Sequence, residues 1–201
     1  MAYPQGINFR ATEGYVTDIS PADFDAGTAF NPTYPLTTAQ GNTVGWEGAG
    51  GIDTRDRSTA PDARLAGINF VSAGGSNTVD YRFDLTSTGD WKMGLACGDY
   101  SGVQGPMRIE IFDTSTSRGR LVDDVSTSAA ARFFDASGVE RTDVTWPTDH
   151  VLVTKNFTTT ICRFRVGGSN LGGVTVIAHA YVESAGSAIP GMMSMYRQRR
   201  I

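Results

Sequence analysis

The sequence contains little cysteine and little histidine. Its two cysteines, Cys97 and Cys162, are too few for a disulfide scaffold, and a chain of 201 residues does not need one. We expect both to be reduced core residues of strands, where free cysteine behaves as a small hydrophobe; pairing across two strands is the alternative. The two histidines, His150 and His179, belong to no HxH or HExxH motif, and no CxxC spacing occurs. The pattern therefore predicts no zinc site and no cofactor, and we assign no metal ligands. A structural calcium ion is left open, because no motif specifies one.

Long apolar runs and an excess of positive charge are also missing. No apolar run approaches the roughly 18 residues that would span a membrane. Residues 1–6 lack the charged and apolar regions of a secretory signal peptide, so we expect synthesis in a host cytoplasm. Lys and Arg number 17 against 21 Asp and Glu, for a formal charge of −4. This balance lacks the excess of positive charge that is typical of nucleic-acid-binding proteins. We expect neither nucleic acid nor membrane as a partner.

The dominant pattern is an alternation of apolar and polar residues with period two. It is strict in the segments 79–85 and 91–97, which are separated by a turn-like stretch at 86–90. We expect these segments to form a hairpin with one face in the core. The residues expected to be buried are Tyr81, Phe83, Leu85, Trp91, Met93 and Leu95. The residues expected to be exposed are Asp80, Arg82 and Asp84.

Further strands follow the same pattern. Apolar residues alternate in segments 107–111 and 162–166, and a last strand is expected over 174–182 with His179 on its outer face, at a surface or an interface. The stretch 135–138 reads as a hairpin turn in which Gly138 supplies the positive φ. Short strands with frequent turns predict an all-β jelly-roll sandwich of two antiparallel sheets. We expect one domain over 1–187, an irregular excursion over Pro21–Thr43, and a basic tail over 188–201.

Several short motifs occur in a familiar order. They are Gly45-Trp46-Glu47-Gly48, Arg55-Asp56-Arg57, Asp62, Tyr81-Arg82-Phe83-Asp84-Leu85, Gly89, and Leu95-Ala96-Cys97-Gly98-Asp99. This order resembles the malectin-like, galactose-binding-like jelly rolls that accompany many carbohydrate esterases and lyases. The resemblance covers roughly residues 6–182, and the chain departs from it at Thr86, where that family often has proline. A weaker similarity links the chain to uncharacterised structural proteins of tailed bacteriophages.

The resemblance implies a sugar site at the rim of the sandwich. Sugar binding uses aromatic faces for the ring CH groups and charged groups for the hydroxyls. The candidates are Trp46, Arg55, Arg57, Asp62, Asp99, Tyr100 and Trp146. The alternative is structural: Trp46 lies in the core, and Arg55 and Asp62 form an ion pair that fixes a loop.

No catalytic constellation accompanies these residues, and we expect no catalytic residues. Neither histidine lies near a Gly-x-Ser-x-Gly motif. Asp123 and Asp124 are adjacent, so on a strand they would point to opposite faces, and we read them as a solvated turn. The sequence therefore predicts a protein that is not an enzyme.

The last 14 residues differ from the rest. They contain three of the 17 cationic residues and none of the 21 acids, which leaves a formal charge of −7 on the remaining chain. Methionine side chains are flexible and can pack against irregular apolar surfaces, and arginine side chains form bidentate pairs with carboxylates. We expect this tail to bind other virion proteins or copies of the same chain; docking on its own domain is the alternative. The residues expected to make this contact are Met192, Met193, Met195, Tyr196, Arg197, Arg199 and Arg200.

Two classes of function remain at this point. The first is a structural component of a bacteriophage virion, such as a capsid decoration, a head fibre or a tail subunit. The second is a carbohydrate-binding module of the galactose-binding-like class. A sugar-contacting aromatic ring that is open at the rim would favour the second class.

Overall fold

The structure is a computed structural model. It describes residues 5–8, 24–25, 33–37, 42–48, 52–57, 59–71, 78–167 and 174–186. Two parts of the predictions lie mostly or wholly outside these residues: the excursion over 21–43, of which only two short strands and their neighbours are described, and the tail over 188–201.

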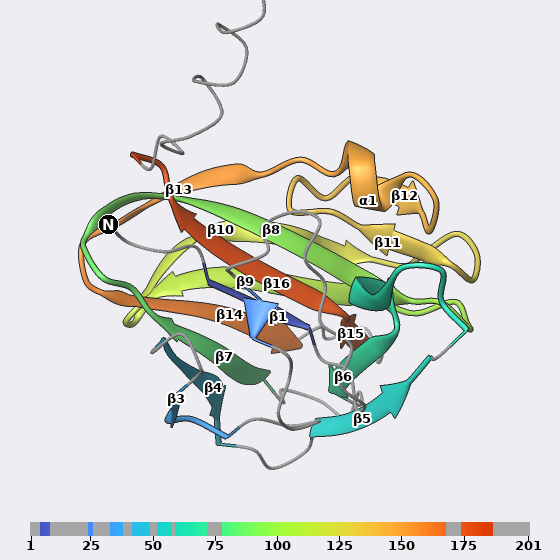
Figure 1. The fold of residues 1–201 in the computed structure, drawn as a ribbon, viewed down its shortest axis with the longest axis horizontal. Helices are drawn as coiled ribbons and strands as arrows, with labels where there is room; N and C mark the ends of the chain where they lie inside the picture. The colour runs from blue at the N-terminus through green and yellow to red at the C-terminus, as the bar shows by residue number, and fades with distance from the viewer. Residues whose placement is uncertain are drawn as a thin grey trace, which may run out of the picture.

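The first large sheet has six antiparallel strands (Figure 1). In spatial order they are β10 (Thr116–Val125), β9 (Met107–Asp113), β14 (Ile161–Gly167), β7 (Thr78–Asp84), β4 (Thr43–Glu47) and β3 (Leu36–Thr37). Apolar residues alternate with polar ones in β7, β9 and β14, and the apolar set is buried in each. The alternation in the sequence therefore marks the face of this sheet that packs on the core.

The second large sheet has seven strands, built around β8. They are β12 (Glu140–Thr142), β11 (Arg132–Phe134), β8 (Gly89–Asp99), β16 (His179–Ser184), β1 (Gln5–Asn8) and β2 (Phe24–Asp25), with β13 (Val153–Phe157) also paired with β8. The β1–β2 pair is parallel, and the other pairs of this sheet are antiparallel. Because β8 is 11 residues long, it pairs with β13 near its start and with β11 at its end.

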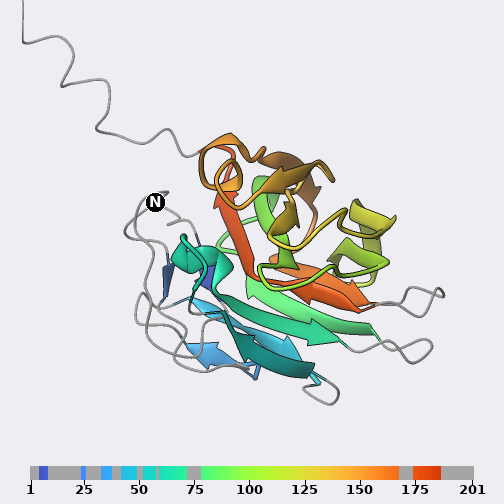
Figure 2. The same ribbon diagram turned by 90° about the vertical axis from the view of Figure 1, so that its right-hand side faces the viewer.

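A third, smaller sheet lies at one end of the sandwich. It contains β15 (Thr175–Ile177), β6 (Gly67–Val71) and β5 (Ile52–Asp56), at the lower right of Figure 1. A short 3-10 helix, η1 (Ala63–Leu65), precedes β6, and a four-residue helix, α1 (Trp146–Asp149), follows β12. Over the residues that the structure describes, the protein is thus an all-β sandwich with almost no helix, as the sequence predicted, and the small sheet is an addition to that plan (Figure 2).

The core lies between the two large sheets and is organised by aromatic rings. Trp46, Tyr81, Phe83 and Phe164 make successive edge-to-face contacts with ring centroids 5.0, 5.2 and 5.5 Å apart. All four are fully buried. The six residues predicted to form the core are all buried, and Cys97 and Cys162 are free thiols within the same core. These predictions are confirmed.

The predicted hairpin between segments 79–85 and 91–97 is wrong. β7 pairs with β14 and β4 in the six-stranded sheet, whereas β8 pairs with β16, β13 and β11 in the other sheet. The link 85–88 thus crosses from one sheet to the other. Alternation fixes which face of a strand is buried, but it does not identify the neighbouring strand.

The polar face of β7 is less exposed than predicted. Asp80, Arg82 and Asp84 are half-buried because they belong to a cross-strand network of ion pairs. Glu47 of β4 accepts from Arg82 and from Arg163 of β14. Side chains of opposite charge on neighbouring strands therefore cover one another on the outer face of the sheet.

The predicted last strand, and His179 on it, also need correction. The strand is interrupted at Ala178, so that β15 belongs to the small sheet and β16 to the seven-stranded sheet. His179 is buried at 1% exposure, with its ring 5.4 Å from the buried Trp146 of α1. It is not a surface residue, because β16 lies inside its sheet and is covered on both faces.

The aspartate pair at 123–124 is likewise not in a solvated turn. Both residues lie in β10, next to an irregularity in the pairing with β9. Asp123 pairs with Arg120, and Asp124 pairs with Arg108. The bulged strand thus directs each carboxylate to its own arginine.

Phe83 provides a direct test of the core. Because its ring is fully buried between Tyr81 and Phe164, we expect Phe83→Ala to lower the free energy of unfolding by about 3–5 kcal/mol. Denaturant melts measure the loss. Val144→Ala, at a valine that is 72% exposed, is the control and should change little. A loss below about 1 kcal/mol for Phe83→Ala would contradict the assignment.

A second test uses Asp135, a buried carboxylate in the β11–β12 turn. Burial raises its pKa, but hydrogen bonds from Ser137, Val139 and Arg141 outweigh burial and bring the pKa below its usual value. The carboxylate therefore stabilises the fold above its unfolded pKa of about 4, and this contribution is lost as pH falls below that value. We expect Asp135→Asn to be less stable than wild type at pH 7, with a difference that shrinks below pH 4. A difference that stays constant with pH would contradict this account.

Candidate functional site

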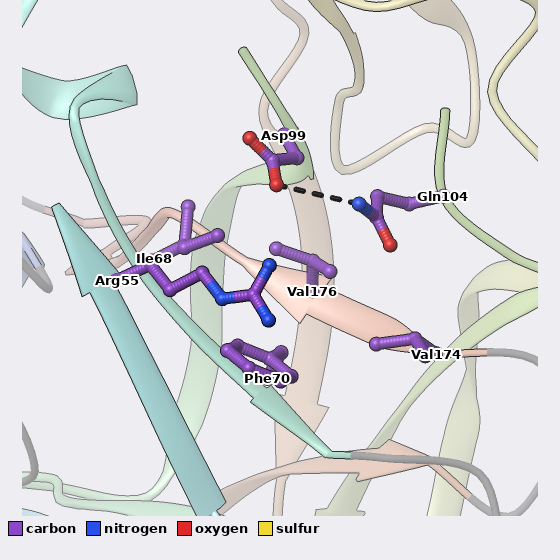
Figure 3. A pocket seen from close by; sticks show the side chains of 7 residues that line it. All are labelled: Arg55, Ile68, Phe70, Asp99, Gln104, Val174 and Val176. Carbon is purple, nitrogen blue, oxygen red and sulfur yellow. Dashed lines mark hydrogen bonds between the residues drawn. The ribbon is translucent and has the colours of Figure 1, made fainter. Parts of the chain in front are cut away.

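A hollow of about 170 Å³ opens where the small sheet meets the end of β8. Figure 3 shows the side chains that surround it. Its lining residues come from four segments of the chain: Arg55, Ile68, Phe70, Asp99, Gln104, Val174 and Val176.

One wall of the hollow is apolar. Ile68 and Phe70 alternate along β6, so both point to the same side of the small sheet. Val176 of β15 is the direct partner of Phe70. Asn69, between them, points to the other side, where it accepts a hydrogen bond from Trp46 Nε1 at 3.0 Å. The β6 sequence thus places apolar side chains in the hollow and a polar one toward the core tryptophan.

The opposite wall is organised by Asp99, the last residue of β8. Its carboxylate is buried and accepts two hydrogen bonds from Arg57, at 2.8 and 2.7 Å. It also accepts from Ser101 N at 2.8 Å and from Gln104 Nε2 at 3.3 Å. The bonds to Asp99 raise the pKa of the Arg57 guanidinium above its usual value. The carboxylate is therefore held in place by four hydrogen bonds from three residues, Arg57, Ser101 and Gln104.

Gly98 lets a neighbouring strand approach this carboxylate. A Cβ at position 98 would lie 2.2 Å from the carbonyl oxygen of Arg132. β11 pairs with β8 at this point, with Arg132 opposite Asp99. Glycine is therefore required before Asp99 because the backbone of β11 passes too close for any side chain.

Arg55 and Gln104 carry the polar groups that face the hollow. The Arg55 guanidinium carbon lies 4.8 Å from the centre of the Phe70 ring, which is a cation–π contact. Arg55 is exposed, and within the described part of the chain it forms no ion pair. Gln104 donates its amide nitrogen to Asp99, which leaves its amide oxygen turned toward the valines (Figure 3). The hollow thus presents a donor and an acceptor beside an apolar wall.

The structure brings together two of the residues predicted for the site. Arg55 and Asp99 line the hollow, and Arg57 lies directly behind Asp99 as its ion-pair partner. Asp62 does not join them, nor does it pair with Arg55. It binds the buried Arg64 two residues later, at 2.6 Å.

The aromatic residues predicted for the site lie elsewhere. Trp46 and Trp146 are fully enclosed in the core, and Tyr100 is partly buried against it. An enclosed Trp46 cannot present a ring face to a ligand, so its assignment to a sugar site is wrong. Both tryptophans bury their large rings, and each indole N–H donates a hydrogen bond within the core. Trp46 donates to the Asn69 side chain, and Trp146 donates to the Leu95 carbonyl.

Sequence reasoning missed five of the lining residues. They are Ile68, Phe70, Gln104, Val174 and Val176. The alternation in segment 67–71 could have placed Ile68 and Phe70 on one face, but only the pairing of β6 with β5 and β15 shows which polar residues they meet.

A second cluster surrounds Trp146 but forms no site. The Arg64 guanidinium carbon lies 5.0 Å from one face of its ring, and His150 stacks with a centroid distance of 4.7 Å. Burial lowers the pKa of His150, and the nearby Arg64 charge adds to this shift. The Arg64 guanidinium and the His150 imidazole both pack against the tryptophan ring, and the lowered pKa keeps that imidazole neutral at pH 7.

Among the residues that the structure describes, no group of three or more His, Cys, Asp or Glu side chains is arranged to hold a metal ion. No helix within that part is long and apolar enough to cross a membrane.

Comparison with known proteins found distant structural likeness only. No protein-family model matches the chain, and no curated protein matches it. The carbohydrate-binding module TmCBM61, solved with β-1,4-galactotriose, is 11% identical with a TM-score of 0.32, over 86% of this chain and 99% of that one. The enzymatically active domain of tailspike protein 4 of bacteriophage CBA120 is 10% identical with a TM-score of 0.29, over 74% of this chain and 20% of that one.

These two likenesses fit the galactose-binding-like resemblance of the sequence and its weaker phage resemblance. At such low identities and TM-scores they assign neither a family nor a function to this chain.

Asp99 provides the test of the site's architecture. We expect Asp99→Asn to lower the free energy of unfolding by about 2–4 kcal/mol, because Arg57 would lose a buried partner. Thermal or urea melts measure the loss. The matched control is Asp123→Asn, which breaks the exposed Arg120–Asp123 pair and should leave the melt almost unchanged. Equal effects of the two variants would contradict a structural role for the Arg57–Asp99 pair.

Proposed function

We propose that the protein is a non-catalytic saccharide-binding module with its ligand in the hollow beside Arg55. The observation that supports this proposal is the pairing of an apolar wall with a donor and an acceptor beside it. A sugar ring has apolar CH faces and hydroxyls at its edge. Ile68, Val174 and Val176 would cover the CH groups, while Arg55 and Gln104 would bind hydroxyls.

The size of the hollow sets the size of the ligand. Its volume of about 170 Å³ is below the roughly 300 Å³ at which pockets for drug-sized ligands begin. A single sugar ring, or the end ring of a chain, is therefore the unit that the hollow would hold.

The state of Asp99 favours binding over hydrolysis. Glycoside hydrolysis uses two carboxyl groups that flank the scissile bond. Asp99 is the one carboxylate among the described residues that line the hollow, and its oxygens already accept four hydrogen bonds. Its role in the proposal is to position Arg57 and Gln104.

A blocking variant tests the proposal. Val174→Trp would fill the hollow from its partly buried edge, and we expect it to abolish saccharide binding on a glycan array or in an NMR titration. The matched control is Val144→Trp, the same change at an exposed valine outside the hollow. Circular dichroism melts verify that both variants fold. Saccharide binding that survives Val174→Trp in a folded protein would overturn the assignment of the site.

A place in a bacteriophage virion is a second proposal, compatible with saccharide binding. Its support is the sequence resemblance to phage structural proteins and the contrast between the basic segment 188–201 and the acidic remainder of the chain. The partners would be other virion proteins or copies of this chain. Mass spectrometry of purified particles tests it: recovery at a fixed copy number is expected, and absence from the particles would overturn it.

A further inference from the structure

The charges around the hollow do not cancel. The two hydrogen bonds from Arg57 neutralise Asp99, and the remaining bonds from Ser101 and Gln104 occupy the same carboxylate. Arg55 is the second cation, and it has no carboxylate partner among the described residues. The described lining therefore carries one uncompensated positive charge.

The Arg55 guanidinium is also held in a defined position. It lies over the Phe70 ring at 4.8 Å, and its strand partner is Ile68, so its stem leans on the apolar wall. Figure 3 shows the guanidinium group extending into the space between Phe70, Val176 and Asp99. A guanidinium fixed in this way presents its N–H groups as a planar fork, which matches a carboxylate in two parallel hydrogen bonds.

The acidic residue on the same face of β5 does not cancel this charge. Asp53 lies two residues before Arg55 and is exposed, but it does not line the hollow and forms no ion pair with Arg55. Gln104 contributes a neutral amide oxygen, which suits a hydroxyl donor. The described hollow therefore combines one site for an anion with one site for a hydroxyl.

We propose that the ligand of this hollow is a sugar that carries a carboxylate, with the carboxylate on Arg55, a hydroxyl on the Gln104 amide oxygen, and the ring against Ile68 and Val176. This inference rests on the proposed saccharide-binding function and specifies its ligand class. Uronic acids and sialic acids share this chemistry, and a test with both distinguishes them.

The experiment titrates the full chain by NMR with matched charged and neutral probes. These are sodium D-galacturonate against D-galactose, sodium D-glucuronate against D-glucose, and sodium N-acetylneuraminate against its methyl ester. We expect at least one carboxylated sugar to bind about two- to fivefold more tightly than its neutral counterpart, as one exposed ion pair would give. The preference should weaken at high salt because the pair is solvent-accessible.

Variants connect the preference to Arg55. Arg55→Gln should reduce the ratio of charged-sugar to neutral-sugar affinity to about onefold, and this ratio is the readout because Arg55 would also contact a hydroxyl of the neutral sugar. Arg55→Lys keeps the charge without the planar fork and should retain part of the preference. The matched control is Arg120→Gln, at an exposed arginine of β10 that does not line the hollow, and it should behave as wild type.

The outcomes separate this inference from the proposed function. Equal binding of charged and neutral sugars by wild type, lost in Val174→Trp, would overturn the inference and support the saccharide site. A preference for carboxylated sugars that persists in Arg55→Gln would also overturn the inference. Failure of every probe to bind would overturn both proposals.

Discussion

The bidentate ion pair between Arg57 and Asp99 connects two sheets that share no strand. Arg57 follows β5 of the small sheet, and Asp99 ends β8 of the seven-stranded sheet. Two hydrogen bonds of 2.8 and 2.7 Å fix both the distance and the orientation of these ends. The hollow lies beside this contact, between the small sheet and the end of β8. Arg55, two residues before Arg57, is positioned by the same contact.

Burial of the Asp99 carboxylate costs free energy of desolvation, which an apolar side chain at the same place would not cost. A buried carboxylate loses several kcal/mol of hydration, by general estimates, and recovers it only with near-complete hydrogen bonding. Asp99 is 1% exposed, and four donors from Arg57, Ser101 and Gln104 satisfy it. An apolar residue would fill the same space without the desolvation. The ion pair is therefore better explained by the position it gives to the lining of the hollow than by net stability.

The sequence predicted burial well and strand neighbours poorly. Strict alternation over 79–85 identified Tyr81 and Phe83 as core, because a strand with one buried face must have period two. The same pattern is silent about partners, so β7 and β8 were paired with each other although they lie in opposite sheets. The prediction for His179 was wrong for a related reason. On a strand such as β16, where consecutive residues are buried, alternation does not distinguish a buried face from an exposed one.

The site was predictable only in part. Arg55 and Asp99 came from the order of short motifs in the family resemblance, and both line the hollow. Trp46 was predicted from the same resemblance and from the general use of aromatic rings in sugar sites. Its ring is buried instead, because burial of so large an apolar surface stabilises the fold. The apolar wall could not be foreseen, because the contact between β6 and β15 joins residues more than 100 positions apart.

The position of Arg55 differs from that of the arginines on the outer face of the six-stranded sheet. Arg82, Arg163 and Arg165 lie there beside Glu47 and Asp80, each in contact with at least one carboxylate. Arg165 also lies 3.9 Å from the centre of the Phe112 ring, so it has the same aromatic support as Arg55. An anionic ligand on that face would have to displace an intramolecular carboxylate, whereas no carboxylate of the described residues pairs with Arg55. The same side chain on the same kind of aromatic support thus pairs with a carboxylate in one place and, among the described residues, with none in the other. The difference is set by whether the neighbouring strand supplies a carboxylate.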